Sequence, residues 1–192
     1  MTTSNDGTRA LSHLEAVYRP GDRELVKSLF DALGLQVVEM GKYIAGLIDT
    51  PPSGNPVENA LFASEITPEH LIFEDALDKA LSQPELTDAG SSYLRALKSE
   101  PQCRPHLGIA FSSMEKWEQS VALIQAKTED AASPLHGRAE LASKFRPGTP
   151  GAQTDFLHHA FVYTDLIGTT GLSLGMIIEL QHYASNPSAQ AA

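Results

Sequence analysis

The chain has almost no cysteine, no concentrated positive charge and no long apolar run. One cysteine, Cys103, stands among 192 residues, so an internal disulfide is excluded and a reducing cytoplasm suits the chain. The formal net charge is −10 and no basic run occurs, so neither nucleic acid nor a membrane surface is an expected partner, because both need concentrated Lys and Arg. No apolar run approaches the ~18 residues of a membrane span, and the first residues lack the apolar region of a signal peptide. We therefore expect a cytoplasmic protein.

The rest of the composition fits one globular domain. Hydrophobic residues make up 42% of the chain and charged residues 20%, which suffices for a substantial core at this length. The domain is expected to span residues 10–183, between flexible ends at 1–9 and 184–192.

The first part of the domain, residues 10–66, reads as one strand, one helix and three strands. Residues 10–18 alternate like a strand, and Asp22 after Pro20-Gly21 is placed to cap a helix that ends at Gly34. Apolar residues recur in that helix at i, i+3, i+4 and i+7, which predicts one buried face. Three further strands are predicted at 35–39, 43–48 and 59–65, with a proline-rich loop at 51–56 before the last.

A helical linker is predicted at residues 67–103. Thr67 precedes Pro68, the arrangement of an N-cap followed by proline in the first helical turn. A second helix is predicted at 91–98. The predicted buried stripe of the first helix consists of Phe73, Ala76, Leu77, Ala80 and Leu81.

The first pattern returns in residues 104–183. A strand at 105–111 is followed by a capping box at Ser112–Glu115 and a helix that carries Trp117, Val121 and Ile124 on one face. Strands are then predicted at 135–145, 160–164 and 174–183. Each copy of the pattern starts with a strand histidine and ends with a strand glutamate, which indicates an internal repeat.

The last predicted strand contains a carboxylate that needs a partner. Glu179 lies among Ile177, Ile178 and Leu180, where an unpaired charge would cost several kcal/mol. With a period of two, Gly175, Ile177, Glu179 and Gln181 share one face of the strand. An interior that accepts such a carboxylate most commonly contains a metal ion.

Four short segments carry a resemblance to a known group of proteins. They are Ser12-His13-Leu14, Ala63-Ser64-Glu65, Pro105-His106-Leu107-Gly108 and Ile177-Ile178-Glu179-Leu180. With the repeated element order, they resemble the vicinal oxygen chelate superfamily of glyoxalase I, bleomycin-resistance proteins and extradiol dioxygenases. The resemblance implies an α+β fold in which two βαβββ units form a curled mixed sheet around one cavity, with the helices outside.

The resemblance also implies a metal site at the bottom of that cavity, with His13, Glu65, His106 and Glu179 as ligands. Two imidazoles and two carboxylates suit a divalent ion such as Zn²⁺, Ni²⁺, Co²⁺, Mn²⁺ or Fe²⁺. The ion would polarise two adjacent oxygens of a small metabolite, and Glu65 or Glu179 would shuttle the proton. We therefore expect a metal-dependent lyase or isomerase of the glyoxalase or epimerase kind.

Two alternatives stay open at this point. If Glu65 is not a ligand, then His13, His106 and Glu179 form the two-histidine, one-carboxylate set of Fe(II) extradiol dioxygenases. A metal-free ligand-binding or resistance protein on the same fold is the other alternative, although such a protein has no need of buried histidine and glutamate pairs. The two units would complete one site either within a chain or across a homodimer.

Several other residues invite a functional interpretation. Glu15 shares the face of His13 and is expected to support it. His158 and His159 come just before a predicted strand; at most one of them can enter the cavity, and we interpret both as ordinary residues. The glycine-rich segment 165–175 is longer than the turn usual in the family, and we expect it to act as a substrate-contacting lid.

Overall fold

A computed structural model describes residues 12–49, 58–152, 154–169 and 171–184. The predicted strand start at residues 10 and 11, the loop at 51–56 and the ends 1–9 and 185–192 lie outside the described residues. The first unit contains β1 (His13–Tyr18), α1 (Arg23–Ala32), β2 (Gln36–Met40), β3 (Tyr43–Leu47) and β4 (Ala60–Glu65). The second contains β5 (His106–Ala110), α4 (Met114–Glu129), β6 (Ala139–Phe145), β7 (Leu157–Thr164) and β8 (Met176–Tyr183).

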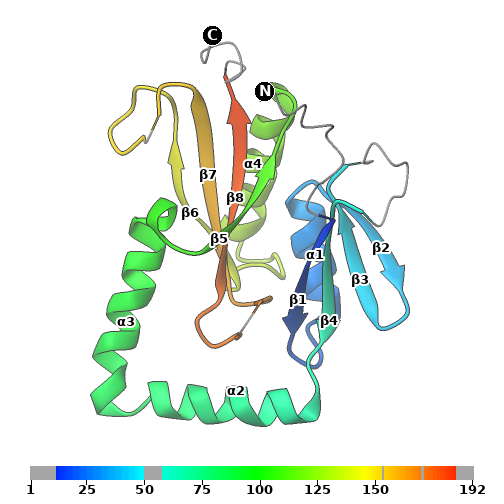
Figure 1. The fold of residues 1–192 in the computed structure, drawn as a ribbon, viewed down its shortest axis with the longest axis vertical. Helices are drawn as coiled ribbons and strands as arrows, with labels where there is room; N and C mark the ends of the chain where they lie inside the picture. Colours follow the sequence, from blue (N-terminus) through cyan, green and yellow to red (C-terminus); the bar gives the residue numbers. More distant parts are fainter. Residues whose placement is uncertain (1–11, 50–57, 153, 170, 185–192) are drawn as a thin grey trace, which may run out of the picture.

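The two units have the same topology, so the α+β prediction of two βαβββ units is confirmed (Figure 1). One sheet has the order β1-β4-β3-β2 and the other has the order β5-β8-β7-β6. In each sheet the first strand pairs in parallel with the last one, and the remaining pairs are antiparallel. A parallel pair requires a crossover between its strands, and α1 and α4 lie within these crossovers.

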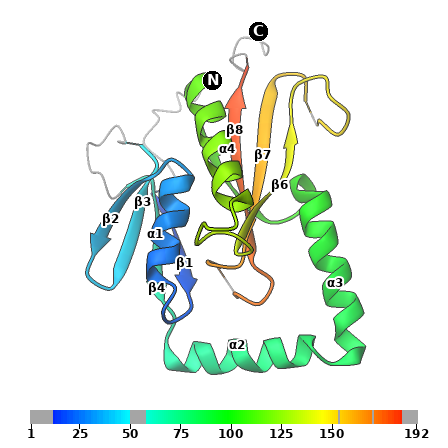
Figure 2. The same cartoon turned by 180° about the vertical axis from the view of Figure 1, so that it is seen from behind.

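The core lies between the sheets and the helices α1 and α4, which cover the same side of the molecule (Figures 1 and 2). Trp117, Val121 and Ile124 are buried on one face of α4, as the spacing predicts. The cap of this helix is Ser113, whose side chain accepts a hydrogen bond from the N–H of Lys116, one residue later than predicted.

Contacts between the two units run along this core. Val17 of β1 and Gly168 exchange backbone hydrogen bonds. The Ser120 hydroxyl donates to the carbonyl oxygen of Leu33 at 2.9 Å. Arg138 donates to Asp22 of the first unit and to Asp165 of the second, at 2.9 and 2.8 Å. The segment after β7 is therefore built into the junction of the units.

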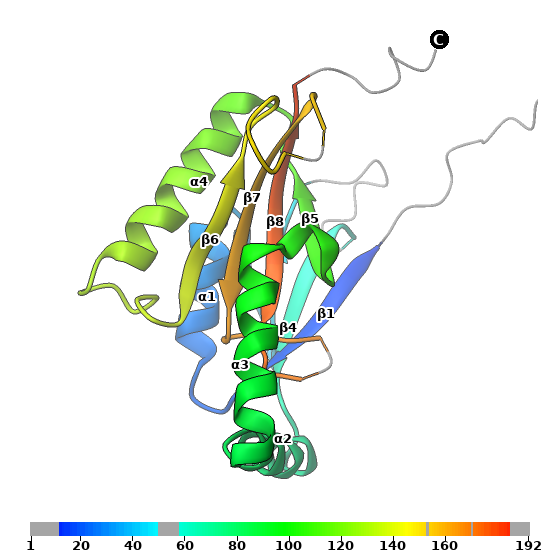
Figure 3. The same cartoon turned by 90° about the vertical axis from the view of Figure 1, so that its left-hand side faces the viewer.

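The linker forms α2 (Pro68–Leu81), α3 (Pro84–Ser99) and a 3₁₀ turn at Pro101–Cys103. Thr67 caps α2 as predicted, but the predicted buried stripe of α2 is wrong, because Phe73 is 60% exposed and Glu74 is the residue that is buried. The reason is that α2 spans the lower edge of the molecule without a sheet beneath it (Figure 1). By contrast, α3 packs Leu97 against Phe161 and Ile177 of the second sheet (Figure 3).

Candidate functional site

Glu179 lies in the middle of β8 with an imidazole near each of its oxygens. The residue is 6% exposed. Nδ1 of His159 lies 2.5 Å from Oε1, and Nε2 of His106 lies 3.3 Å from Oε2. The sequence predicted that this carboxylate needs a partner, and the structure supplies two.

Strand pairing explains why these three residues meet. β8 is a central strand, with β5 on one side and β7 on the other. Gly108 of β5 lies opposite Glu179, and His106 is two residues earlier. On the other side Phe161 lies opposite Glu179, and His159 is two residues earlier. Since side chains two residues apart share a face, both imidazoles point to the face that carries the carboxylate.

The hydrogen bonds of His106 determine what can lie between it and Glu179. Nδ1 is 2.7 Å from the carbonyl oxygen of Arg104, an acceptor, so Nδ1 carries a hydrogen. In a neutral ring, Nε2 would then turn its lone pair toward the carboxylate. A cation between these two acceptors would stabilise both of them.

Phe161 gives this group an apolar wall. It is fully buried, with the His106 ring edge-on at a centroid distance of 5.7 Å and the His159 ring stacked at 5.8 Å. Within the described residues, Nε2 of His159 is buried and has no hydrogen-bond partner. Water is largely excluded from this side of Glu179, which strengthens its interactions with the two imidazoles.

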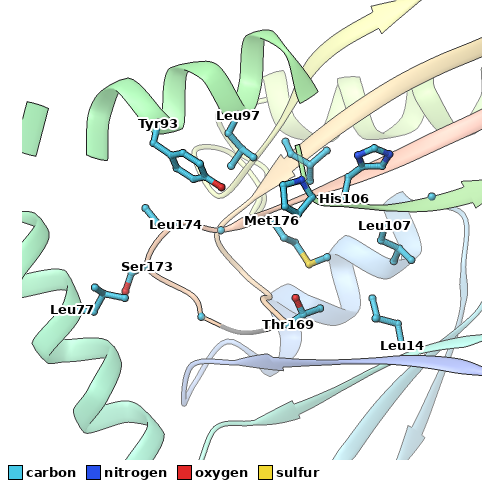
Figure 4. A pocket seen from close by; sticks show the side chains of 15 residues that line it. Leu14, Leu77, Tyr93, Leu97, His106, Leu107, Thr169, Ser173, Leu174 and Met176 are labelled. Atoms are coloured by element: carbon cyan, nitrogen blue, oxygen red, sulfur yellow. The ribbon is translucent and has the colours of Figure 1, made fainter. Parts of the chain in front are cut away.

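A cavity of about 630 Å³ adjoins the group. Its size is that of typical small-molecule sites. His106 and Gly108 line it, and Figure 4 shows Leu14 of β1 on one side with Tyr93 and Leu97 of α3 on the other. The polar side chains at its wall, besides His106, are Tyr93, Thr169 and Ser173, and the remainder of the wall is largely apolar.

The segment between β7 and β8 and the first residue of β8 form part of this wall through Thr169, Gly171 and residues 173–176. Glu74 of α2 holds it in place, because the backbone N–H and the hydroxyl of Ser173 both donate to Oε2 of Glu74, at 3.0 and 2.7 Å. Leu166, Ile167 and Leu172 of the same segment are buried. The predicted contact of this segment with a substrate stays a prediction, but in this structure the segment is anchored.

The structure separates two predicted ligands of the first unit. Because β1 and β4 are parallel, His13 lies opposite Ala60 and Glu65 lies opposite Tyr18. Five residues of strand, about 16 Å, therefore separate the level of His13 from that of Glu65. His13 lines a different hollow, together with Glu15, Met40, Tyr43 and Phe62. Of the four predicted ligands, His106 and Glu179 are the two that come together.

These two residues fit part of a metal site. An imidazole nitrogen and a carboxylate oxygen 3.3 Å apart can bind one ion, and the second ring nitrogen of His106 donates to a carbonyl, as it does in most metal-bound histidines. In the described part of the chain, however, no group of three or more His, Cys, Asp or Glu residues is arranged to hold a metal ion. The expected four-ligand shell is therefore not formed by this arrangement.

His159 is the site residue that the sequence interpretation missed. Alternation allowed at most one of His158 and His159 to share the face of the cavity, and it did not indicate which. The signal that decides is the register of the antiparallel pair β7–β8, which places His159 opposite Gln181 and so diagonal to Glu179. The strand was predicted to start at residue 160, whereas it starts at Leu157.

Comparisons with known proteins add little at this site. No family model matches the chain, and no curated protein matches it. A crystal structure of protein PA1353 from Pseudomonas aeruginosa is similar with a TM-score of 0.41 and 10% identity, covering 91% of this chain and 98% of that one. A likeness of this degree carries no argument about function. Among the described residues, no helix is long and apolar enough to cross a bilayer.

Proposed function

We propose that the chain is an enzyme that moves a proton on a small oxygenated metabolite, of the glyoxalase or epimerase kind found in the vicinal oxygen chelate superfamily. One observation carries the proposal. A buried carboxylate, Glu179, lies between two imidazoles next to a cavity, and one of the imidazoles, His106, is at the cavity wall. Titratable groups gathered beside a cavity of this size are the usual setting of acid–base chemistry.

The two oxygens of Glu179 have different surroundings, and this assigns their roles. Oε1 accepts the short hydrogen bond from His159, which fixes the orientation of the carboxylate. Oε2 faces His106 and Gly108, and a β-carbon on Gly108 would lie 3.5 Å from it. Because Gly108 lines the cavity and has no side chain, Oε2 is the oxygen on the side of the cavity wall, although Glu179 itself does not line the cavity.

The proposed reaction uses Oε2 as a base. It removes a proton from a carbon next to a carbonyl, the electron pair of the C–H bond forms a carbon–carbon double bond, and the π electrons of the carbonyl move onto its oxygen. Return of the proton from Oε2 to the neighbouring carbon gives an isomer, and delivery of a proton from water to the other face of the first carbon gives an epimer. A divalent ion would be held by His106 and Glu179, and when bound it supplies a Lewis acid for the adjacent oxygens of the substrate.

One observation favours a second function, the metal-free binding of a ligand in the same cavity. Two of the four predicted metal ligands come together and the other two lie apart from them, so the predicted metal shell is incomplete. The cavity wall is also largely apolar, as in a site that sequesters a hydrophobic molecule. The dioxygenase alternative has less support, because it requires His13, which lines a different hollow from His106.

An exchange experiment separates these functions. Protein prepared without an affinity tag would be incubated in D₂O with α-hydroxy ketones, 2-oxo acids and hemithioacetals, both as prepared and after loading with Zn²⁺, Ni²⁺, Co²⁺, Mn²⁺ or Fe²⁺. Loss of the proton signal at the carbon next to the carbonyl, followed by NMR, reports proton transfer. We expect exchange with at least one of these classes.

The variant Glu179→Gln should lose the exchange, and Glu140→Gln should keep it, since Glu140 lies on β6 of the same sheet and pairs with Lys98. Exchange that persists in Glu179→Gln would contradict the proposal. Ligand binding without exchange in any metal form would favour the metal-free function.

A further inference from the structure

A second pair of histidines lies on the other face of the second sheet. His158 of β7 and His182 of β8 are directly opposite each other in the antiparallel register. Their ring centroids are 6.1 Å apart and the rings are tilted by 37°. We propose that this pair binds a late transition-metal ion, such as Ni²⁺ or Cu²⁺, at a site distinct from Glu179.

In the described part of the chain, each ring has one nitrogen for which no hydrogen bond is seen. Nδ1 of His182 lies 3.0 Å from the carbonyl oxygen of Phe111 and donates to it, so Nε2 is the nitrogen left for a metal ion. Nδ1 of His158 is buried and, within the described residues, has no hydrogen-bond partner. A backbone acceptor behind one ring and an unpartnered nitrogen on the other are what a metal-binding imidazole pair needs.

The spacing of the rings is compatible with one shared ion. A metal–nitrogen bond of 2.0–2.1 Å puts the centroids of two coordinating imidazoles at most about 6.5 Å apart. The observed 6.1 Å is within that limit. Imidazole is a preferred ligand of Ni²⁺, Cu²⁺ and Zn²⁺, and affinity at a given nitrogen site rises toward Cu²⁺.

The surroundings of His158 favour its neutral form, which is the form that binds a metal. Burial lowers the pKa of His158, and the nearby Arg146 and His182 lower it further. The positive charge of Arg146 is offset by its ion pair with Glu118 at 2.9 Å. Trp117 packs edge-on against His158 at a centroid distance of 5.5 Å and is itself held by a hydrogen bond to the carbonyl oxygen of Leu180.

This site is independent of the proposed enzyme site. Adjacent residues of a strand point to opposite faces. His158 lies on the face covered by α4, where Trp117 packs against it, and His159 lies on the face of Glu179. The failure of either proposal therefore leaves the other untouched.

The chain carries its own probe for this site, because Trp117 is its one tryptophan. Ni²⁺ bound to His158 and His182 would lie close to the indole and quench its fluorescence. Nickel is the probe of choice because it does not oxidise Cys103, which is exposed. We expect saturable quenching by one equivalent of Ni²⁺, and the variants His158→Gln and His182→Gln should each weaken it by roughly tenfold or more.

Two controls accompany the titration. His136→Gln removes a histidine of the loop after α4, and Glu179→Gln alters the opposite face, so both should leave the quenching unchanged. In the wild-type protein, paramagnetic Ni²⁺ should broaden the ring signals of His158 and His182 before those of the other histidines. The proposal would be overturned if Ni²⁺ did not quench the fluorescence, or if both His→Gln variants kept the quenching. It would also be overturned if the ring signals of other histidines broadened first.

Discussion

Glu74 of α2 accepts hydrogen bonds from the backbone N–H and the hydroxyl of Ser173, 99 residues further along the chain. The carboxylate is fully buried, and His70 lies 3.3 Å from its other oxygen. Ser173 belongs to the wall of the cavity next to His106. The linker between the two units is therefore also the support of the cavity wall.

Replacement of Glu74 by Gln should loosen this support. The amide keeps one acceptor, but it loses the charge that strengthens the two bonds from Ser173, so we expect the free energy of unfolding to fall by about 1–3 kcal/mol. Urea unfolding measures this change, and hydrogen exchange should show faster exchange at residues 171–176. Asp75→Asn is the matched control, because Asp75 is exposed and pairs with Arg19 at the surface, where the loss should be below about 1 kcal/mol. Equal losses in the two variants would contradict this assignment.

The same carboxylate should make stability depend on acid pH. Burial raises the pKa of Glu74, but the hydrogen bonds from Ser173, Leu172 and His70 outweigh burial, and the pKa is lowered from 4.5. A group whose pKa is lower in the folded state stabilises the fold above its unfolded pKa, and this contribution is lost as the pH falls through the folded value. Wild-type stability should therefore fall more steeply than that of Glu74→Gln below about pH 4.5. Parallel curves of unfolding free energy against pH would rule this out.

The packing of the two linker helices predicts that replacing a large side chain by alanine lowers the free energy of unfolding in one helix and not in the other. Leu97 of α3 is buried against Phe161 and Ile177, so Leu97→Ala should lower the free energy of unfolding by about 2–4 kcal/mol. Phe73 of α2 is 60% exposed, and Phe73→Ala should change the free energy of unfolding by less than about 0.5 kcal/mol. Chemical denaturation of both variants checks this, and a larger loss in Phe73→Ala would mean that α2 is covered in solution.

Gly108 offers a test of access to Glu179. A methyl group on Gly108 would meet Oε2 of Glu179 and Nε2 of Gln181 at 3.5 Å, which is ordinary contact, so Gly108→Ala should fold normally. It would cover the oxygen that we propose as the base, and deuterium exchange into the substrate should slow by roughly tenfold or more. Far-UV circular dichroism is the control for folding. An unchanged exchange rate would show that substrate reaches the carboxylate by another route.

How far the sequence predicts this protein depends on the range of the interactions involved. Local patterns sufficed for the buried stripe of α4, the Thr67 cap and the apolar strand around Glu179, because each depends on neighbours within a few residues. The stripe of α2 failed, because an amphipathic spacing predicts a buried face only where another element is present to cover it. Nothing local indicates that α2 spans an edge without a sheet beneath it.

Which residues meet at the site depends on strand register, and the sequence does not show the register. The first and last strands of both units carry a histidine and a glutamate, yet the outcome differs between the units. His106 lies two residues from the position opposite Glu179, whereas His13 lies five residues from the position opposite Glu65. Register is set by the packing of whole strands. It places the histidine and the glutamate close together in the second unit and far apart in the first.

The central claim is that His106 and Glu179 act as one unit in proton transfer, and a double-mutant cycle tests it most directly. The rate of deuterium exchange into the substrate would be measured for the wild type, His106→Gln, Glu179→Gln and the double variant. If the residues form one unit, each single change should lower the rate by roughly a hundredfold or more, and the double variant should be no slower than the slower single variant. Losses that multiply in the double variant, or a wild-type rate in either single variant, would contradict the claim.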